Sequence, residues 1–540
     1  MAFLKRWPLS HPLFWAIVYF IGLGSLSVIL GQDVSWDLRN YHFYNPYMLL
    51  TGRVNYDILP AQIQTFFNPL LDTPFFVAIY YLKFPPVVVG FLLGGFHGLN
   101  QWFVHLIAYH SLYKVSEIYR LTLSILAAIT SIIGAAYLSE LGTSIGDSTS
   151  SVFILAGLFL IIYSLSQSST VSPKIIMLTG VIFGLATGLK LTTALYSISL
   201  LVAINFLPNS FREKIRNLAI IIPSMMAGFS LTMGYWIVLM WSNFSNPVFP
   251  FFNKIFRSPY IETDFNFQDL RFLPKDIWQF LFYPFYFWHE PPLTAELSFR
   301  ETRFAIAYIL ICITIGALVY RQVNGRSPSS TNEVIHVPIL FFLLPFYLAA
   351  YGIWVKNFSI YRYLLVLELI TPVLFFLIIA YLCPHRKSVF IVTVAIFSLV
   401  AVTVRPLDWW RIDWSENYFH IDKQALVKYE NDVIVFWGGE PTAYVVPYFP
   451  ATTRFVRITG NFGLSPHTLM SKRASEILKK TPEKSLYLLE VNFERESREK
   501  ESAKKTDLAV HNLKIDRSRC EPFITAIEKY SLCPLVRDGR

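Results

Sequence analysis

Charged residues are scarce in this chain of 540 residues, in which Asp, Glu, Lys and Arg make up only 15%. Soluble domains carry roughly 25% charged residues, so the shortage excludes an ordinary soluble protein. The sequence also contains no metal-ligand spacing, no glycine-rich phosphate loop and no nucleophile elbow, which removes the common motifs of soluble enzymes. A nucleic-acid partner is equally unsupported, because no base-stacking or groove-reading module accompanies the net charge of +10.

Hydrophobic residues, by contrast, make up 54% of the chain and come in long blocks. Because one bilayer crossing needs roughly 20 apolar residues, we predict an α-helical polytopic membrane protein with about 11 transmembrane helices. The expected spans are residues 12–30, 86–112, 121–138, 149–166, 174–188, 190–206, 217–240, 304–320, 336–352, 361–382 and 388–404. Residues 71–82 form a shorter apolar segment, and we expect an interfacial or re-entrant helix there.

Basic residues set the expected orientation, because short cytoplasmic loops collect Lys and Arg. With a cytoplasmic N-terminus, each short loop on that side is net basic, and an odd number of spans places the C-terminus outside. The residues concerned are Lys5, Arg6, Lys114, Arg120, Lys174, Arg212, Lys214, Arg216, Arg321, Arg326, Arg386 and Lys387. We therefore expect an integral multi-pass protein, most simply of a bacterial inner membrane, with its polar segments on the exported face.

Two long exported loops interrupt the predicted membrane domain, residues 1–404. Loop 31–72 has about forty residues, and loops of that length are usually functional or disordered. Its many aromatic residues argue against disorder, so we expect a folded lid with interfacial helices. Loop 242–303 contains the aromatic piece PKDIWQFLFYPFYFWHEPP (274–292), which is typical of an in-plane interfacial helix. An ordinary aromatic belt and a groove for a lipid substrate remain open for this run.

After residue 404 the composition changes to that of a small exported α/β domain, residues 405–540. Residues 432–437 and 485–491 are typical of short buried strands, and residues 466–480 have helical periodicity. Cys520 and Cys533 both lie in this exported segment, where an oxidising compartment permits a disulfide between them.

Several short pieces of the sequence together resemble one group of membrane enzymes. They are WDLRNYHFY (36–44), GTSIGDST (142–149), GLATGLKLTTAL (184–195), SNPVFPFFN (245–253) and IYRYLLVLELITP (360–372). With one span before a long exported loop, this organisation is similar to the GT-C superfamily of integral-membrane glycosyltransferases. That group includes protein O-mannosyltransferases, aminoarabinose transferases and polyprenyl-phosphate-mannose-dependent mannosyltransferases. The resemblance implies transfer of a sugar from a polyprenyl-phosphate-linked donor to a lipid, glycan or protein acceptor on the exported face, with no obligatory cofactor or metal.

By this resemblance, Asp37 is the general base that takes the proton of the attacking acceptor hydroxyl. Asp33 is its nearest competitor, and a helix N-cap is the structural alternative for Asp37. The departing lipid phosphate mainly needs cationic stabilisation. Arg362 would provide it through a bidentate contact, or would instead extend to the membrane interface. Lys190 would reach the phosphate, or would instead cap a helix or pair with an acid.

Three further residues complete the candidate binding set. Asp147 would contact the acceptor or a metal, or would cap the helix that follows it. His42 and Arg39 are candidates for substrate contact as well. Packing among aromatic residues is the stronger explanation for His42, and a salt bridge within the loop is the stronger explanation for Arg39.

Two other functions stay open at this point. A lipid or polysaccharide transporter or flippase would place ionisable groups at mid-membrane depth and would show internal repeats. Candidates for such groups are Lys190, Glu368, His97 and His105, and no repeat is evident. A scaffold that binds partners through residues 405–540 would leave the acids of loop 31–72 without a role.

Overall fold

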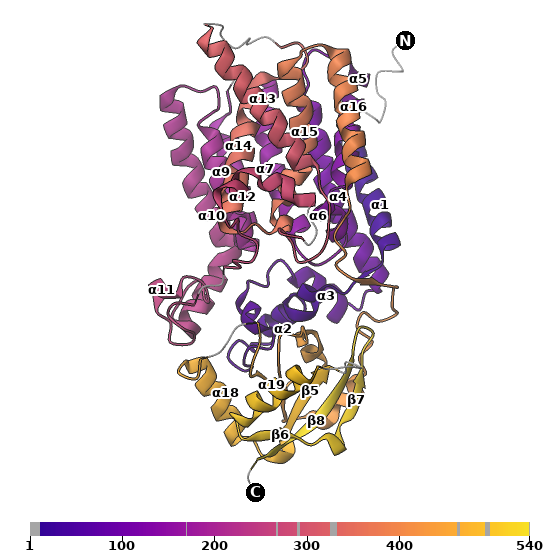
Figure 1. The fold of residues 1–540 in the computed structure, drawn as a ribbon, viewed down its shortest axis with the longest axis vertical. Helices are drawn as coiled ribbons and strands as arrows, with labels where there is room; N and C mark the ends of the chain where they lie inside the picture. Colours follow the sequence, from indigo (N-terminus) through magenta and orange to yellow (C-terminus); the bar gives the residue numbers. More distant parts are fainter. Residues whose placement is uncertain are drawn as a thin grey trace. The chain divides into compact units, whose positions relative to one another are not determined.

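Helices make up most of the structure (Figure 1), a computed structural model that describes residues 11–168, 170–265, 268–288, 292–324, 332–461, 465–491 and 497–538. Eight of the described helices are long and apolar enough to cross a membrane. They are α1 (Pro12–Leu30), α4 (Pro86–Ser111), α7 (Asp147–Gln167), α10 (Phe211–Phe244), α13 (Arg303–Val323), α14 (Val337–Asn357), α15 (Leu365–Leu382) and α16 (Arg386–Thr403).

The remaining predicted spans also contain helices, but shorter ones. These are α5 (Glu117–Ile132), α8 (Pro173–Leu189) and α9 (Ala194–Ile204). Residues 71–82 contain the eight-residue helix α3 (Thr73–Tyr80), as expected from their length. The polytopic helical character of the chain is thus confirmed, while the number of eleven crossings stays a prediction. Lys5, Arg6 and Arg326, which contributed to the expected topology, lie outside the described residues.

Contacts divide the chain into two units, and each unit is assembled from three stretches of sequence. The helical unit contains residues 1–30, 90–233 and 268–409. The sheet unit contains residues 31–89, 234–267 and 410–540. This grouping differs from the single division at residue 404 that composition suggested, because chain segments far apart in sequence associate.

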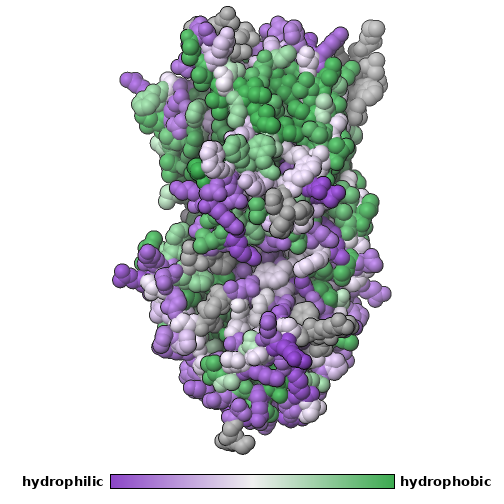
Figure 2. Space-filling model, in the orientation of Figure 1, coloured by the Kyte–Doolittle hydropathy of each residue, from purple (hydrophilic) through white to green (hydrophobic). Residues whose placement is uncertain are grey.

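Helix α15 forms the centre of the helical unit. Every residue from Leu365 to Tyr381 is buried, which suits a helix that is hydrophobic on all sides. It packs against α5, α7, α13, α14 and α16. Outside this core, Figure 2 shows hydrophobic side chains gathered over the bundle. Ile309 and Ile313 of α13 are examples of exposed apolar residues in this unit. Broad exposed apolar surfaces of this kind mark contact with a membrane or a partner.

Glycines bring α8 and α10 into close contact within the helical unit. Gly180, Gly184 and Gly188 recur every fourth residue, so they share one face of α8. A Cβ atom on Gly184 would lie 2.1 Å from the carbonyl oxygen of Met225 in α10. From the other side, a Cβ atom on Gly228 would lie 2.1 Å from the carbonyl oxygen of Val181. Small residues at this spacing allow helix backbones to approach closely in membranes.

The variant Gly184→Leu is therefore expected to lower the free energy of unfolding by about 1–3 kcal/mol, because the added side chain meets backbone that cannot withdraw without separating the helices. Denaturant unfolding of the purified protein in detergent measures the change. Gly352→Leu is the matched control, since a Cβ atom at Gly352 has no atom within 4 Å. Equal losses in the two variants would show that the α8–α10 contact contributes nothing specific.

The predicted strands and helix of the C-terminal region are all present in the sheet unit. Its sheet has the order β4-β3-β5-β8-β6, with β7 also paired to β8. Strands β3 (Val433–Phe436), β4 (Arg454–Arg457) and β5 (Leu486–Val491) run parallel, whereas β6 (Leu513–Ile515), β7 (Glu521–Ile524) and β8 (Lys529–Arg537) pair antiparallel. Helices α18 (Leu469–Lys480) and α19 (Arg498–Ala509) belong to the same unit. Cys520 and Cys533 form the predicted disulfide.

Loop 31–72 is an integral part of this sheet unit. Its first strand β1 (Gln32–Asp33) pairs antiparallel with β2 (Arg411–Ile412), and Ile58 forms a parallel bridge with Val456 of β4. The loop also holds helix α2 (Tyr44–Leu50). The predicted helices of this loop are thus present. Within the sheet unit, the loop contacts residues from the C-terminal part of the chain.

Loop 242–303 is divided between the two units. Its first part contains α11 (Asn253–Phe256) in the sheet unit, and its second part contains α12 (Ile277–Phe282) and η6 (Tyr283–Trp288) in the helical unit. None of the α12 residues is buried, and Trp278 is 68% exposed. Such an apolar, exposed short helix agrees with the in-plane interfacial helix expected for the aromatic run. Residues 266–267 and 289–291 of this loop lie outside the described residues.

Candidate functional site

Three of the predicted site residues lie at or beside one small cleft of the helical unit. Asp147 is the first residue of α7, Lys190 separates α8 from the short helix η5 (Leu191–Thr193), and Arg362 lies in η7 (Tyr361–Leu364). Asp147 and Arg362 both line the cleft, and the Lys190 ammonium binds Asp147 at 2.8 Å. Hydroxyl groups supply much of the remaining polar lining, from Ser150, Thr192, Thr193 and Tyr196.

A tight turn places Asp147 at the cleft. Gly142 and Gly146 adopt positive φ values of 74° and 88°, a conformation that L side chains rarely adopt. The helix therefore begins with a buried carboxylate at its positive end, which stabilises the negative charge. The N-cap residue is Gly146, so the expectation that Asp147 caps the helix is wrong by one residue.

Lys190 is held by two oxygen atoms from this turn. Its Nζ atom lies 2.8 Å from Asp147 Oδ1 and donates a hydrogen bond of 2.8 Å to the carbonyl oxygen of Ile145. The expected pairing of Lys190 with an acid is thus present. The second carboxylate oxygen of Asp147 is buried and has no hydrogen-bond partner among the described residues. It remains an acceptor available to a ligand in the cleft.

Aromatic rings fix the direction of Arg362. Its guanidinium carbon lies 5.4 Å from the ring centre of Tyr363 and 5.6 Å from that of Trp409. Cation–π contacts of this kind restrict a long side chain without neutralising its charge. Arg362 is half-buried and lines the cleft. This position favours a role in the cleft over extension to the membrane interface.

Glu140 is a buried member of this group that the sequence interpretation missed. It ends helix α6 (Ala135–Glu140), is fully buried, and accepts hydrogen bonds from the backbone nitrogen of Ser148 at 3.1 Å and from the Ser148 hydroxyl at 3.2 Å. Burial raises the pKa of Glu140 well above its usual value, Asp147 raises it further, and Lys190 lowers it. The only signal in the sequence was an acid just before the turn that contains Asp147.

The second group of predicted residues lies in the sheet unit, on the π-helix η3 (Leu38–His42). Asp37 immediately precedes this element and is half-buried. Its backbone is helical, with φ −62° and ψ −44°, and its side chain makes no capping hydrogen bond. Asp37 thus occupies the N-cap position that the structural alternative expected, but without its capping hydrogen bond. Short π-helical segments are rare and frequently occur at functional sites.

Neighbours of Asp37 are already engaged within the sheet unit. Arg39 binds Glu528 at 2.7 Å, so the expected salt bridge exists, although its partner comes from residues 410–540 and not from the loop. His42 Nδ1 lies 2.6 Å from Asp72 Oδ1, and both side chains are buried. Asp33, the competitor of Asp37, is only 2% exposed and accepts a hydrogen bond from the Ser35 backbone at 2.8 Å.

Asp37 and Asp147 belong to different units, and their meeting in one active site stays a prediction. His97 proves to be structural, because it accepts a hydrogen bond from the Gly142 backbone at 3.1 Å and contacts the Thr149 hydroxyl at 2.9 Å. Within the described residues, no three His, Cys, Asp or Glu side chains gather as metal ligands.

Neither a comparison with protein-family models nor one with curated proteins finds a match to this chain.

Proposed function

We propose that this protein transfers a sugar from a polyprenyl-phosphate-linked donor to a lipid, glycan or protein acceptor. The proposal rests mainly on one observation: Asp147 and Arg362 line one cleft among apolar helices, and Lys190 is paired with Asp147 beside it. A donor with a polyprenyl tail requires a protein whose site opens beside a hydrocarbon phase, and the long apolar helices supply such surroundings. The resemblance of the sequence to GT-C glycosyltransferases supports the same conclusion.

The cleft offers the chemistry that departure of a lipid phosphate requires. A guanidinium binds phosphate oxygens through two parallel hydrogen bonds, and an ammonium adds a second positive charge. Only about 10 Å³ of the cleft is open to the centre of a water molecule, which is roughly the space of one water. The donor phosphate therefore enters by separating Lys190 from Asp147 or by displacing Arg362, and either movement frees a cation to bind it.

The role of Asp37 completes the proposed reaction. As the acceptor oxygen bonds to the anomeric carbon, the bond to the phosphate oxygen breaks and the acceptor proton passes to the Asp37 carboxylate. Arg39 and His42 would act by supporting the helix that carries Asp37, since both already have carboxylate partners. In the proposed topology the chain crosses a bacterial inner membrane eleven times, with a cytoplasmic N-terminus and with both groups of residues on the exported side.

A lipid or polysaccharide transporter is the second candidate, and one specific observation favours it. Glu301, Arg303 and Glu368 form a fully buried charged cluster in the helical unit. Buried charges within apolar helices often mark a transport pathway. Purified protein in liposomes that moves a fluorescent lipid between leaflets, and that transfers no sugar, would establish this alternative.

Arg362 provides the test of the transferase proposal. Arg362→Gln is expected to raise the KM for the lipid-linked donor by about 10–100-fold, because a charge-assisted contact contributes about 1.5–3 kcal/mol. The measurement uses purified protein in membranes lacking the native copy, together with radiolabelled polyprenyl-phosphate-linked sugars. Arg216→Gln is the control, since its guanidinium makes only a loose, exposed pair with Glu213 at 3.9 Å. An unchanged donor KM in Arg362→Gln would remove the cleft from donor binding.

A further inference from the structure

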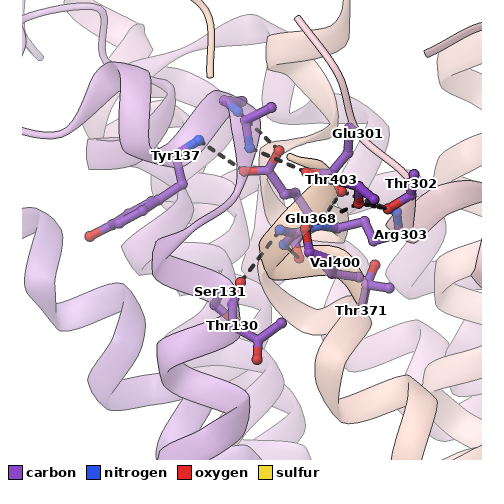
Figure 3. Close-up of polar contacts among 12 residues, drawn as sticks. Thr130, Ser131, Tyr137, Glu301, Thr302, Arg303, Glu368, Thr371, Val400 and Thr403 are labelled. Carbon is purple, nitrogen blue, oxygen red and sulfur yellow. Dashed lines mark hydrogen bonds and ion pairs between the residues drawn. The ribbon is translucent and has the colours of Figure 1, made fainter. Parts of the chain in front are cut away.

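Glu301, Arg303 and Glu368 form a fully buried ionic cluster in the helical unit (Figure 3). Arg303 Nε is 2.9 Å from Glu301 Oε1, and Arg303 also donates a hydrogen bond of 3.0 Å to the backbone carbonyl of Glu368. The exposed fractions of these three residues are 0–1%. Replacing such a cluster by apolar residues is often neutral or stabilising, so its presence calls for an explanation other than stability.

The two carboxylates of the cluster bind the beginning of α6. Glu368 accepts hydrogen bonds from the backbone nitrogens of Ala136 at 3.0 Å and Tyr137 at 2.8 Å. Glu301 accepts one from Ala135 at 3.3 Å. Figure 3 shows the Glu368 carboxylate directed at the Tyr137 nitrogen. These are nitrogen atoms that a helix of this length leaves without partners inside itself, so the carboxylates fix its start.

From α6 the contacts continue to the turn that carries Asp147. Glu140, the last residue of α6, accepts the two hydrogen bonds from Ser148 in the first turn of α7. The Tyr137 hydroxyl donates a hydrogen bond of 2.9 Å to the carbonyl oxygen of His97, whose ring accepts one from Gly142. Helix α6 thus holds both ends of the turn, and the turn supplies both oxygen atoms that bind Lys190.

We propose that Glu368 is a positioning residue that sets the geometry of the Asp147–Lys190 pair through α6. For sugar transfer, this inference rests on the proposed function, in which Lys190 and Arg362 bind the donor phosphate. Glu368 itself does not line the cleft. Without the hydrogen bonds from Glu368 to the start of α6, the turn 142–147 can shift. The distance between Asp147 and Lys190 then increases, while the rest of the bundle stays in place.

Two variants release α6 in independent ways. Glu368→Gln keeps the size of the side chain, but its amide nitrogen cannot accept a hydrogen bond from the second backbone nitrogen. Gly134→Ala adds a Cβ atom that would lie 2.0 Å from Glu368 Oε1, so the carboxylate must move. The backbone at Gly134 has an ordinary φ of −64°, which alanine also adopts. Gly352→Ala is the matched control, because its Cβ atom has no neighbour within 4 Å.

The readout is the reactivity of Lys190 toward an amine-acetylating reagent in the purified full-length protein, measured by mass spectrometry. Both variants are expected to raise it about tenfold, the change that corresponds to loss of roughly one hydrogen bond. Asp147→Asn serves as the positive reference, and Gly352→Ala should match the wild type. The acetylation of Lys504, which is buried in the sheet unit, should stay the same in all variants. The unfolding temperature should also stay the same.

Two substitutions of Glu140 test the contact between α6 and the turn that carries Asp147. Glu140→Gln keeps an oxygen atom for the two Ser148 hydrogen bonds and should leave Lys190 protected, whereas Glu140→Ala should expose it. Unchanged Lys190 reactivity in Glu368→Gln and Gly134→Ala, or in Asp147→Asn, would overturn the proposal, as would a general rise at all lysines with a lower unfolding temperature. Because labelling requires no transfer activity, the two proposals fail separately. Raised labelling of Lys190 in the two variants, together with a wild-type protein that transfers no sugar, would support the positioning role of Glu368 and count against the proposed function.

Discussion

Asparagine in place of Asp37 is expected to reduce sugar transfer by about 10²–10⁴-fold, the usual contribution of a general base. The amide has the same shape as the carboxylate but cannot take the proton of the acceptor hydroxyl. Folding should be preserved, because Asp37 is half-buried, its side chain makes no capping hydrogen bond, and asparagine keeps its size. The KM for the donor should stay near the wild-type value, since the donor phosphate is bound by Lys190 and Arg362 in this proposal. Initial rates with a saturating radiolabelled donor measure the loss.

Asp33→Asn is the matched control for Asp37→Asn, because both acids lie in the same loop. The oxygen of asparagine can still accept the hydrogen bond that Ser35 donates to Asp33, so transfer should continue. Retained transfer in Asp37→Asn combined with its loss in Asp33→Asn would exchange the roles of the two residues. Loss in both, with a lower unfolding temperature, would indicate that the loop and not a base had been damaged.

Features of the fold with local sequence signals were predictable. Apolar runs identified helices, because the burial of a helix such as α15 on all sides requires a stretch that is almost wholly hydrophobic. Strands β3 and β5 were evident for the same reason, as short buried runs. The pairing of Cys520 with Cys533 needed only two cysteines in one segment that the predicted topology places outside the membrane. In each case the evidence lay within a few neighbouring residues.

Long-range association left no comparable signal. Nothing in loop 31–72 indicates that Ile58 lies beside Val456, since a single bridge places few demands on residue type. Asp147, Lys190 and Arg362 were selected from separate segments, and the structure places Asp147 and Arg362 at one cleft, with Lys190 bound to Asp147. Glu140, Glu301 and Arg303 were passed over, because an isolated acid or base at the end of an apolar run is indistinguishable from an ordinary helix end until its partner is known.

Alanine in place of Asp57 is expected to destabilise the sheet unit by about 3–5 kcal/mol, the usual result of removing one partner of a buried ion pair. Arg53 and Asp57 form two contacts of 2.7 Å, and their side chains are 5% and 1% exposed. Without Asp57, the Arg53 charge stays buried. The Tyr44 hydroxyl and the Phe455 backbone nitrogen, which bind Asp57 at 2.9 and 3.0 Å, also lose their acceptor.

This pair joins the segment that carries Asp37 to the C-terminal residues of the same unit. Arg53 donates hydrogen bonds to the carbonyl oxygens of Ala451 at 2.6 Å and Thr453 at 2.7 Å. Asp57→Ala should therefore abolish transfer although Asp57 touches no substrate in the proposed reaction. Limited proteolysis should show new cleavage both within residues 31–89 and beyond residue 410.

Lys480→Ala is the control for Asp57→Ala, because it breaks an exposed pair with Glu476 within α18 and should change stability by at most about 0.5 kcal/mol. The double variant Arg53→Ala with Asp57→Ala should be less harmful than the sum of the single variants, since no charge then stays buried alone. Cleavage confined to residues 31–89 in Asp57→Ala would show that the loop folds without residues 410–540. In that case the loop alone would position Asp37, and residues 410–540 would not be needed to hold the proposed base in place.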